Sequence, residues 1–130
     1  MRHRLTRLAD ADITHLLQET LRAFGPRQVQ TYAALLDRAI ALVAEAPTRA
    51  SSRDRSDLAA GVRSFHVALA SGRKHGAAHV LYFTVVDQAQ RGHEVVILRV
   101  LHDRMEPRPR LISETGTDGM AEDDPGPCRP

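Results

Sequence analysis

A Gly25-Pro26 pair between two long amphipathic stretches constrains the fold of this chain more than any other feature. Glycine can take the left-handed position that ends a helix, and proline is tolerated in the first turn of the next one. The pair therefore predicts two helices joined with almost no loop, the first capped by Asp10 or Asp12. In the first stretch the apolar residues follow one face of a 3.6-residue period: they are Ile13, Leu16, Leu17, Leu21 and Phe24.

The second helix is expected from Pro26 to about Ala46, with Pro47 as its stop. Leu35 and Leu42 flank its main apolar stripe, so more than one side of this helix is apolar. Ordinary core packing explains this surplus, and so does a groove for an amphipathic partner helix. Residues 47–60 are polar and lack a period, which predicts a surface loop.

Four segments have the pattern of strands. Residues 2–8 and 62–67 alternate, whereas residues 79–86 and 94–101 are apolar on both faces. The links at 70–76 and 87–92 are short enough for hairpins, so the last three strands should form an antiparallel meander. The expected fold is α+β, in the order β-α-α-β-β-β. Its N-terminal helical hairpin packs on one face of a small, mainly antiparallel sheet, and the other face is left to solvent or a partner.

The formal net charge of +2 conceals an uneven distribution. Residues 112–130 hold five acidic side chains against Arg129 alone, so this part carries −4 and residues 1–111 carry +6. We expect residues 1–111 to form the domain and residues 112–130 to be a flexible acidic tail rich in Pro and Gly. A basic body predicts a negatively charged partner.

The composition excludes several classes of protein. The single cysteine, Cys128, leaves no disulfide framework and no cysteine-based zinc site. No apolar run approaches the roughly 18 residues of a membrane span, and the N-terminus has no hydrophobic signal-peptide core. We therefore expect a soluble, cytoplasmic protein that makes no membrane contact.

No pattern predicts an enzyme or a cofactor site. A Gly-rich phosphate loop and a G-x-S-x-G nucleophile motif are both missing from the sequence. His75 and His79 have the spacing of helical metal ligands but fall beside a strand, so no metal is expected. His102 and Asp103 are neighbours at a strand end, where side chains alternate between faces, so we do not expect them to act as a catalytic pair.

Arg99 interrupts an apolar strand pattern that runs from residue 95 to residue 101. Burying an unpaired guanidinium costs several kcal/mol. Arg99 should therefore either face an open groove or pair with a carboxylate, from this chain or from a partner.

Three segments together resemble the ParE toxins of the RelE/ParE superfamily. They are residues 61–67 (GVRSFHV), 79–83 (HVLYF) and 96–106 (VILRVLHDRME), followed by a short basic stretch that ends at Leu111. The resemblance covers residues 2–111 and includes the order of helices and strands. The sequence departs from the family pattern in Pro107 and Pro109, in Glu106 where Asp is more usual, and in a longer link at 70–77.

The resemblance implies the toxin of a type II toxin-antitoxin pair, which inhibits DNA gyrase without catalysis or cofactor and is neutralised by a ParD-like antitoxin. An acidic, amphipathic antitoxin segment is expected on the hairpin groove and the basic sheet. Its expected contacts are Arg63, Phe65, Arg99, Leu35 and Leu42. The gyrase-directed surface is expected at the end of the last strand and beyond it, with Arg99, His102, Arg104, Met105 and Arg108.

Two other functions compete with this interpretation. The RelE branch of the superfamily cleaves mRNA on the ribosome and uses a basic cluster with a late Tyr or His. Here the last tyrosine is Tyr82, in mid-sheet, and His102 is the late candidate, so gyrase is favoured. A DNA-binding regulatory module is less well supported, because no polar recognition helix faces outward. We expect no sequence-specific contact with nucleic acid.

Overall fold

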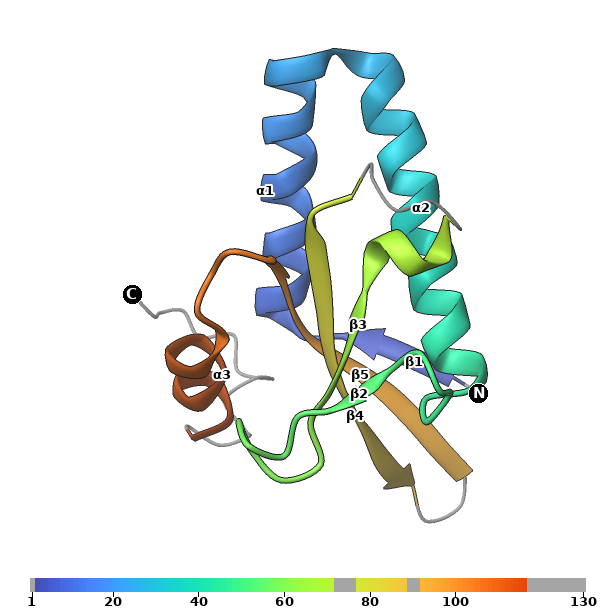
Figure 1. Cartoon of the computed structure of the whole chain (residues 1–130), viewed down its shortest axis with the longest axis vertical. Coiled ribbons are helices and arrows are strands. Elements are labelled where there is room, and N and C mark those ends of the chain that lie inside the picture. The colour runs from blue at the N-terminus through green and yellow to red at the C-terminus, as the bar shows by residue number, and fades with distance from the viewer. Residues whose placement is uncertain (1, 72–76, 89–91, 117–130) are drawn as a thin grey trace.

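The computed structural model describes residues 2–71, 77–88 and 92–116 and contains the expected β-α-α-β-β-β order, with a short extra strand and a C-terminal helix added to it (Figure 1). The elements are β1 (Arg2–Leu5), α1 (Arg7–Phe24), α2 (Pro26–Glu45), β2 (Arg53–Asp54), β3 (Arg63–His66), a 3-10 turn η1 (Val67–Ala70), β4 (His79–Gln88), β5 (Gly92–His102) and α3 (Pro107–Gly116). The sheet order is β1-β5-β4-β3-β2. β1 runs parallel to β5 and the other pairs are antiparallel, which confirms the predicted α+β fold.

The helical hairpin forms where the sequence predicts it. Gly25 alone separates the helices, with a φ of 92°, and its N–H donates to the carbonyl of Leu21 at 3.0 Å. The predicted cap was wrong, because α1 begins earlier and Thr6 caps it. The Thr6 hydroxyl accepts from the Ala9 N–H at 3.0 Å and donates to the Leu98 carbonyl at 2.8 Å, so one side chain both caps α1 and ties it to β5.

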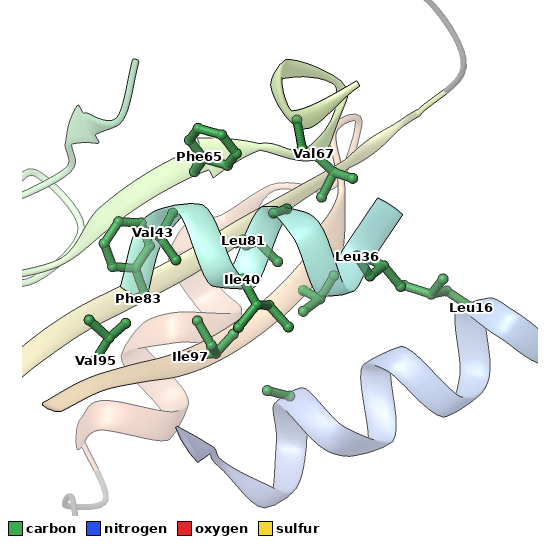
Figure 2. Packing of buried hydrophobic residues seen from close by; sticks show 14 of the residues in the cluster. Leu16, Leu36, Ile40, Val43, Phe65, Val67, Leu81, Phe83, Val95 and Ile97 are labelled. Atoms are coloured by element: carbon green, nitrogen blue, oxygen red, sulfur yellow. The ribbon is translucent and has the colours of Figure 1, made fainter. Parts of the chain in front are cut away.

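The hairpin covers one face of the sheet with an apolar core (Figure 2). α2 contributes the predicted stripe, and Leu35 and Leu42 are half-buried against the same core. The extra apolar residues of α2 therefore serve ordinary core packing. The buried side chains that meet in this core include Leu36, Ile40 and Val43 from α2 and Phe65, Leu81, Phe83, Val95 and Ile97 from the strands.

The second face of the sheet is covered as well, although the sequence left it to solvent or a partner. Leu58 and Val62, from the segment before β3, and Leu111 of α3 pack there against Tyr82 and Leu98. Leu111 has no exposed surface. Segments of this chain therefore cover both faces of the sheet.

Helix α3 is the main element that the sequence did not predict. It continues to Gly116, so the expected boundary between residues 111 and 112 falls inside a helix. Residues 117–130 of the expected flexible tail lie outside the described residues. Two smaller differences are that the first strand ends at Leu5 and that the expected loop at 47–60 contains the two-residue strand β2.

Candidate partner-binding cleft

The helical hairpin extends beyond the sheet (Figure 1). A cleft of about 740 Å³ lies between the hairpin and the ends of the central strands. It lies between α1, the first turns of α2, the start of β4 and the end of β5. Two large apolar side chains border it and remain exposed: Phe24 at the hairpin tip, 74% exposed, and Met105 in the turn after β5, 43% exposed. Exposed apolar side chains at the border of a cleft are typical of surfaces that bind a partner.

The polar side chains of the cleft come from three different elements: Tyr32 of α2, His79 of β4 and His102 of β5. The Tyr32 hydroxyl oxygen lies 2.9 Å from His79 Nδ1 and accepts the Ala78 N–H at 3.3 Å. The rings of His79 and His102 meet edge to face, with centroids 5.4 Å apart. These contacts connect the first turns of α2 to the start of β4 and the end of β5.

Asp103 continues this network to β3. Its Oδ2 lies 3.1 Å from His66 Nε2, and its Oδ1 lies 3.4 Å from His102 Nδ1. The prediction that His102 and Asp103 point to opposite faces was therefore wrong: β5 ends at His102, and Asp103 already belongs to a turn in which strand alternation no longer holds.

The hydrogen bonds assign one tautomer to all three histidines. Backbone N–H groups of Ala68 and Arg104 donate to Nδ1 of His66 and His102, each at 3.1 Å. The Tyr32 hydroxyl is placed to donate to Nδ1 of His79. Each ring therefore carries its proton on Nε2. His102 Nδ1 has no proton to give to Asp103, so the two do not form the oriented acid-base pair that catalysis needs.

Burial shapes the electrostatics of the cleft. Desolvation, with a smaller contribution from His102, lowers the pKa of His79 to about 4. Burial likewise raises the pKa of Tyr32. The hydrogen bond from His66 lowers the pKa of Asp103. At neutral pH, His79 and Tyr32 are therefore uncharged and Asp103 is ionised.

The low pKa of His79 predicts an acid-sensitive fold. Below pH 6.5 the unfolded chain protonates this histidine, whereas the folded chain does so only near pH 4. The contribution of His79 to stability is therefore complete above pH 6.5 and is lost as the pH falls to about 4. The loss is at most a few kcal/mol, because each pKa unit corresponds to about 1.4 kcal/mol and solvent screening at the half-buried ring reduces the effect.

Urea unfolding between pH 4 and 7.5 measures this effect. The His79→Asn variant keeps an acceptor for Tyr32 but cannot titrate, so its stability should fall less over this range than that of the wild type. His93→Asn is the matched control, since His93 lies beside Asp87 at 3.5 Å, outside the cleft. Equal pH dependence in the wild type and His79→Asn would contradict the prediction.

The structure uses most of the expected antitoxin contacts internally. Arg63 holds the segment after α2: its Nε donates to the Pro47 carbonyl at 3.2 Å, and its Nη2 donates to Ser52 Oγ at 2.8 Å. Phe65 is only 2% exposed, so a direct antitoxin contact by this ring does not fit its place in the core. Leu35 and Leu42 pack against the core, as described above.

Arg99 pairs with a carboxylate of this chain. Its Nε and Nη2 lie 2.8 and 2.9 Å from the two oxygens of Asp12 in α1, and both side chains are 15% exposed. Asp12 Oδ2 also accepts the Val100 N–H at 2.9 Å. β1 ends at Leu5, opposite Ile97, so β1 no longer pairs with β5 at Val100. There the Asp12 carboxylate takes the place of a strand carbonyl as acceptor of the Val100 N–H.

The expected gyrase-directed residues lie in three different places. His102 and Met105 line the cleft, and Arg104 is exposed between them. Arg108 is exposed on α3, where it donates to the Asp57 carbonyl at 2.8 Å. Arg99, by contrast, points toward α1. The structure therefore brings His102, Arg104 and Met105 together and separates them from Arg99.

Phe24, Tyr32 and His79 were not predicted as cleft residues. The helical period assigned Phe24 to the apolar face of the first helix, yet Phe24 is exposed, whereas Tyr32 both packs in the core and lines the cleft. The sequence did contain a signal for Phe24, because this residue lies next to the Gly25-Pro26 turn. The tip of a hairpin that extends beyond the sheet has nothing to pack against, so its apolar residues stay exposed.

Across the described residues, no group of three His, Cys, Asp or Glu side chains is placed to hold a metal ion. None of the helices in the described ranges is long and apolar enough to cross a membrane.

Comparisons with known proteins agree with this architecture. A solved structure, titled "Chromosomal ParDE TA system from P. aeruginosa", has a TM-score of 0.58 and 19% sequence identity. The match covers 78% of this chain and 95% of that one, and at this identity it supports the fold. No curated protein matches the chain. Residues 4–107 match the family model for the ParE toxin of the type II toxin-antitoxin system parDE. The chain therefore belongs to the ParE family of type II toxins.

Proposed function

We propose that this protein arrests growth by inhibiting DNA gyrase without catalysis, and that a ParD-like antitoxin neutralises it in the cytoplasm. The match of residues 4–107 to the ParE family carries this proposal, because gyrase inhibition is the known activity of ParE toxins. The exposed positions of the late motif support it: Arg104, Met105 and Arg108 all face solvent at the end of β5 and on α3.

The proposed binding site of the antitoxin is the cleft. It has a volume of about 740 Å³ and is lined by α1, α2 and the ends of β4 and β5. Phe24 and Met105 offer apolar surface that the rest of the described chain does not cover. Met105 also belongs to the proposed gyrase-directed surface, so an antitoxin segment in the cleft would cover part of that surface. Because the two proposed surfaces overlap, a bound antitoxin would neutralise the toxin by competing directly with gyrase.

A supercoiling assay with purified gyrase tests the activity. The toxin should inhibit supercoiling, and the antitoxin that co-purifies with it should restore the reaction. Arg104→Glu should weaken inhibition about tenfold, because it reverses a charge on the proposed surface. Arg2→Glu is the control, since Arg2 pairs with Glu94 near the start of β5, whereas Arg104 follows the end of that strand, and Arg2 lies outside the cleft. Normal supercoiling at toxin concentrations that arrest growth would contradict the proposal.

The second candidate is ribosome-dependent mRNA cleavage. One observation favours it: His102, the late histidine, adjoins His79 and Tyr32 in an open cleft. Against it, His79 is a weak base because of its low pKa, and His102 Nδ1 accepts the Arg104 N–H and so has no proton to donate to Asp103. Cut transcripts in a translating extract, together with unaffected supercoiling, would establish this function instead.

A further inference from the structure

Two ring N–H donors of the cleft lack an acceptor among the described residues. The His66 Nε2–H is taken by Asp103. The Nε2–H groups of His79 and His102 have no acceptor within the part of the chain that the structure describes. The two carboxylates at the border already have donors, because Glu19 pairs with Arg22 at 3.0 Å and Asp103 with His66. Arg104, exposed beside His102, adds a positive charge.

We propose that the antitoxin segment in the cleft carries an acidic side chain whose carboxylate accepts the Nε2–H groups of His102 and His79, while its apolar side chains cover Phe24 and Met105. This inference rests on the proposed function and names the chemistry of its partner. A carboxylate has two oxygens and accepts several hydrogen bonds, so one acidic residue can satisfy both rings.

The surrounding charges favour a carboxylate over other groups. A lysine or arginine from the partner would meet Arg104 and find no unpaired carboxylate among the described residues of the cleft. A wholly apolar segment would bury two N–H donors without acceptors, which is costly. An acidic, amphipathic segment satisfies both the donors and the apolar border.

Affinity measurements with histidine variants test this contact. The probe is the antitoxin that restores supercoiling in the assay above, titrated into the full-length toxin by calorimetry. His102→Ala should weaken binding about tenfold, the typical cost of a lost charge-assisted hydrogen bond. His102→Gln keeps an N–H donor near the Nε2 position and should stay within about threefold of the wild type. His93→Ala, outside the cleft, should leave the affinity unchanged.

A second measurement changes only the antitoxin and leaves the toxin fold untouched. Alanine replacement of each acidic residue in the antitoxin should identify one whose loss costs about tenfold with the wild-type toxin and little with His102→Ala. Equal affinities for wild type and His102→Ala, or no acidic residue coupled to His102, would overturn the inference while leaving the proposed function intact. Failure of the wild-type toxin to bind any antitoxin would overturn the proposed function itself.

Discussion

Replacing Asp12 by alanine should lower the free energy of unfolding by about 3–5 kcal/mol, the usual cost of breaking a buried ion pair from one side. The variant removes the Asp12 carboxylate from the guanidinium of Arg99 in a site where both side chains are 15% exposed. It also removes the acceptor of the Val100 N–H. Thermal and urea unfolding measure the loss.

Asp10→Ala provides the matched control for Asp12→Ala. Asp10 is an exposed carboxylate in the first turn of the same helix, so its loss should cost no more than about 1 kcal/mol through the helix dipole. The double variant Asp12→Leu with Arg99→Met should be more stable than the two single costs predict, because it removes both charges together. Equal costs for Asp10→Ala and Asp12→Ala would refute the structural role of the pair.

Replacing Leu111 by alanine should cost about 2–5 kcal/mol or detach α3 from the sheet. Leu111 is a fully buried residue of α3 and belongs to the second core together with Leu58, Val62 and Leu98. Urea unfolding separates the two outcomes when it is combined with hydrogen exchange of α3. A loss of global stability lowers the urea midpoint of the whole domain, whereas detachment of α3 speeds hydrogen exchange of the α3 amides alone.

Leu69→Ala is the control for this second prediction, because Leu69 is an exposed leucine on η1 and its truncation should cost less than about 1 kcal/mol. If α3 detaches, Arg108 loses its contact with Asp57 and leaves its place next to the end of β5. Gyrase inhibition should then fall even where the rest of the domain stays folded. Unchanged stability and unchanged exchange in Leu111→Ala would contradict the packing described for α3.

The elements that were predicted correctly depend on short-range patterns. The helical period and the Gly25-Pro26 turn act over a few residues, so they locate both helices closely. The errors arose where a distant partner decides the outcome. Thr6 became the cap of α1 because its hydroxyl also bonds β5 at Leu98. Helix α3 was missed because its period is weak and Leu111, its buried anchor, depends on a sheet face formed by other segments.

The candidate site could be predicted only in part, for the same reason. The late motif predicted His102 and Met105 as gyrase-directed residues; the structure places both in the lining of the cleft, and their contact with gyrase stays a prediction. Arg99 was recognised as a charge in need of a partner, but Asp12 lies 87 positions away and nothing local distinguishes it from other carboxylates. Phe65 was assigned to a surface because the motif carries no information about burial.

Residue order and local periodicity alone were sufficient to define the helical hairpin, the meander and the ParE resemblance, because each depends on neighbours along the chain. Tertiary packing decided which side chains remain available to a partner. It turned Arg63, Phe65 and Arg99 inward and placed α3 over the second sheet face. It also joined the hairpin tip, Tyr32, His79 and His102 into one cleft, since burial and hydrogen-bond pairing are settled only when distant segments meet.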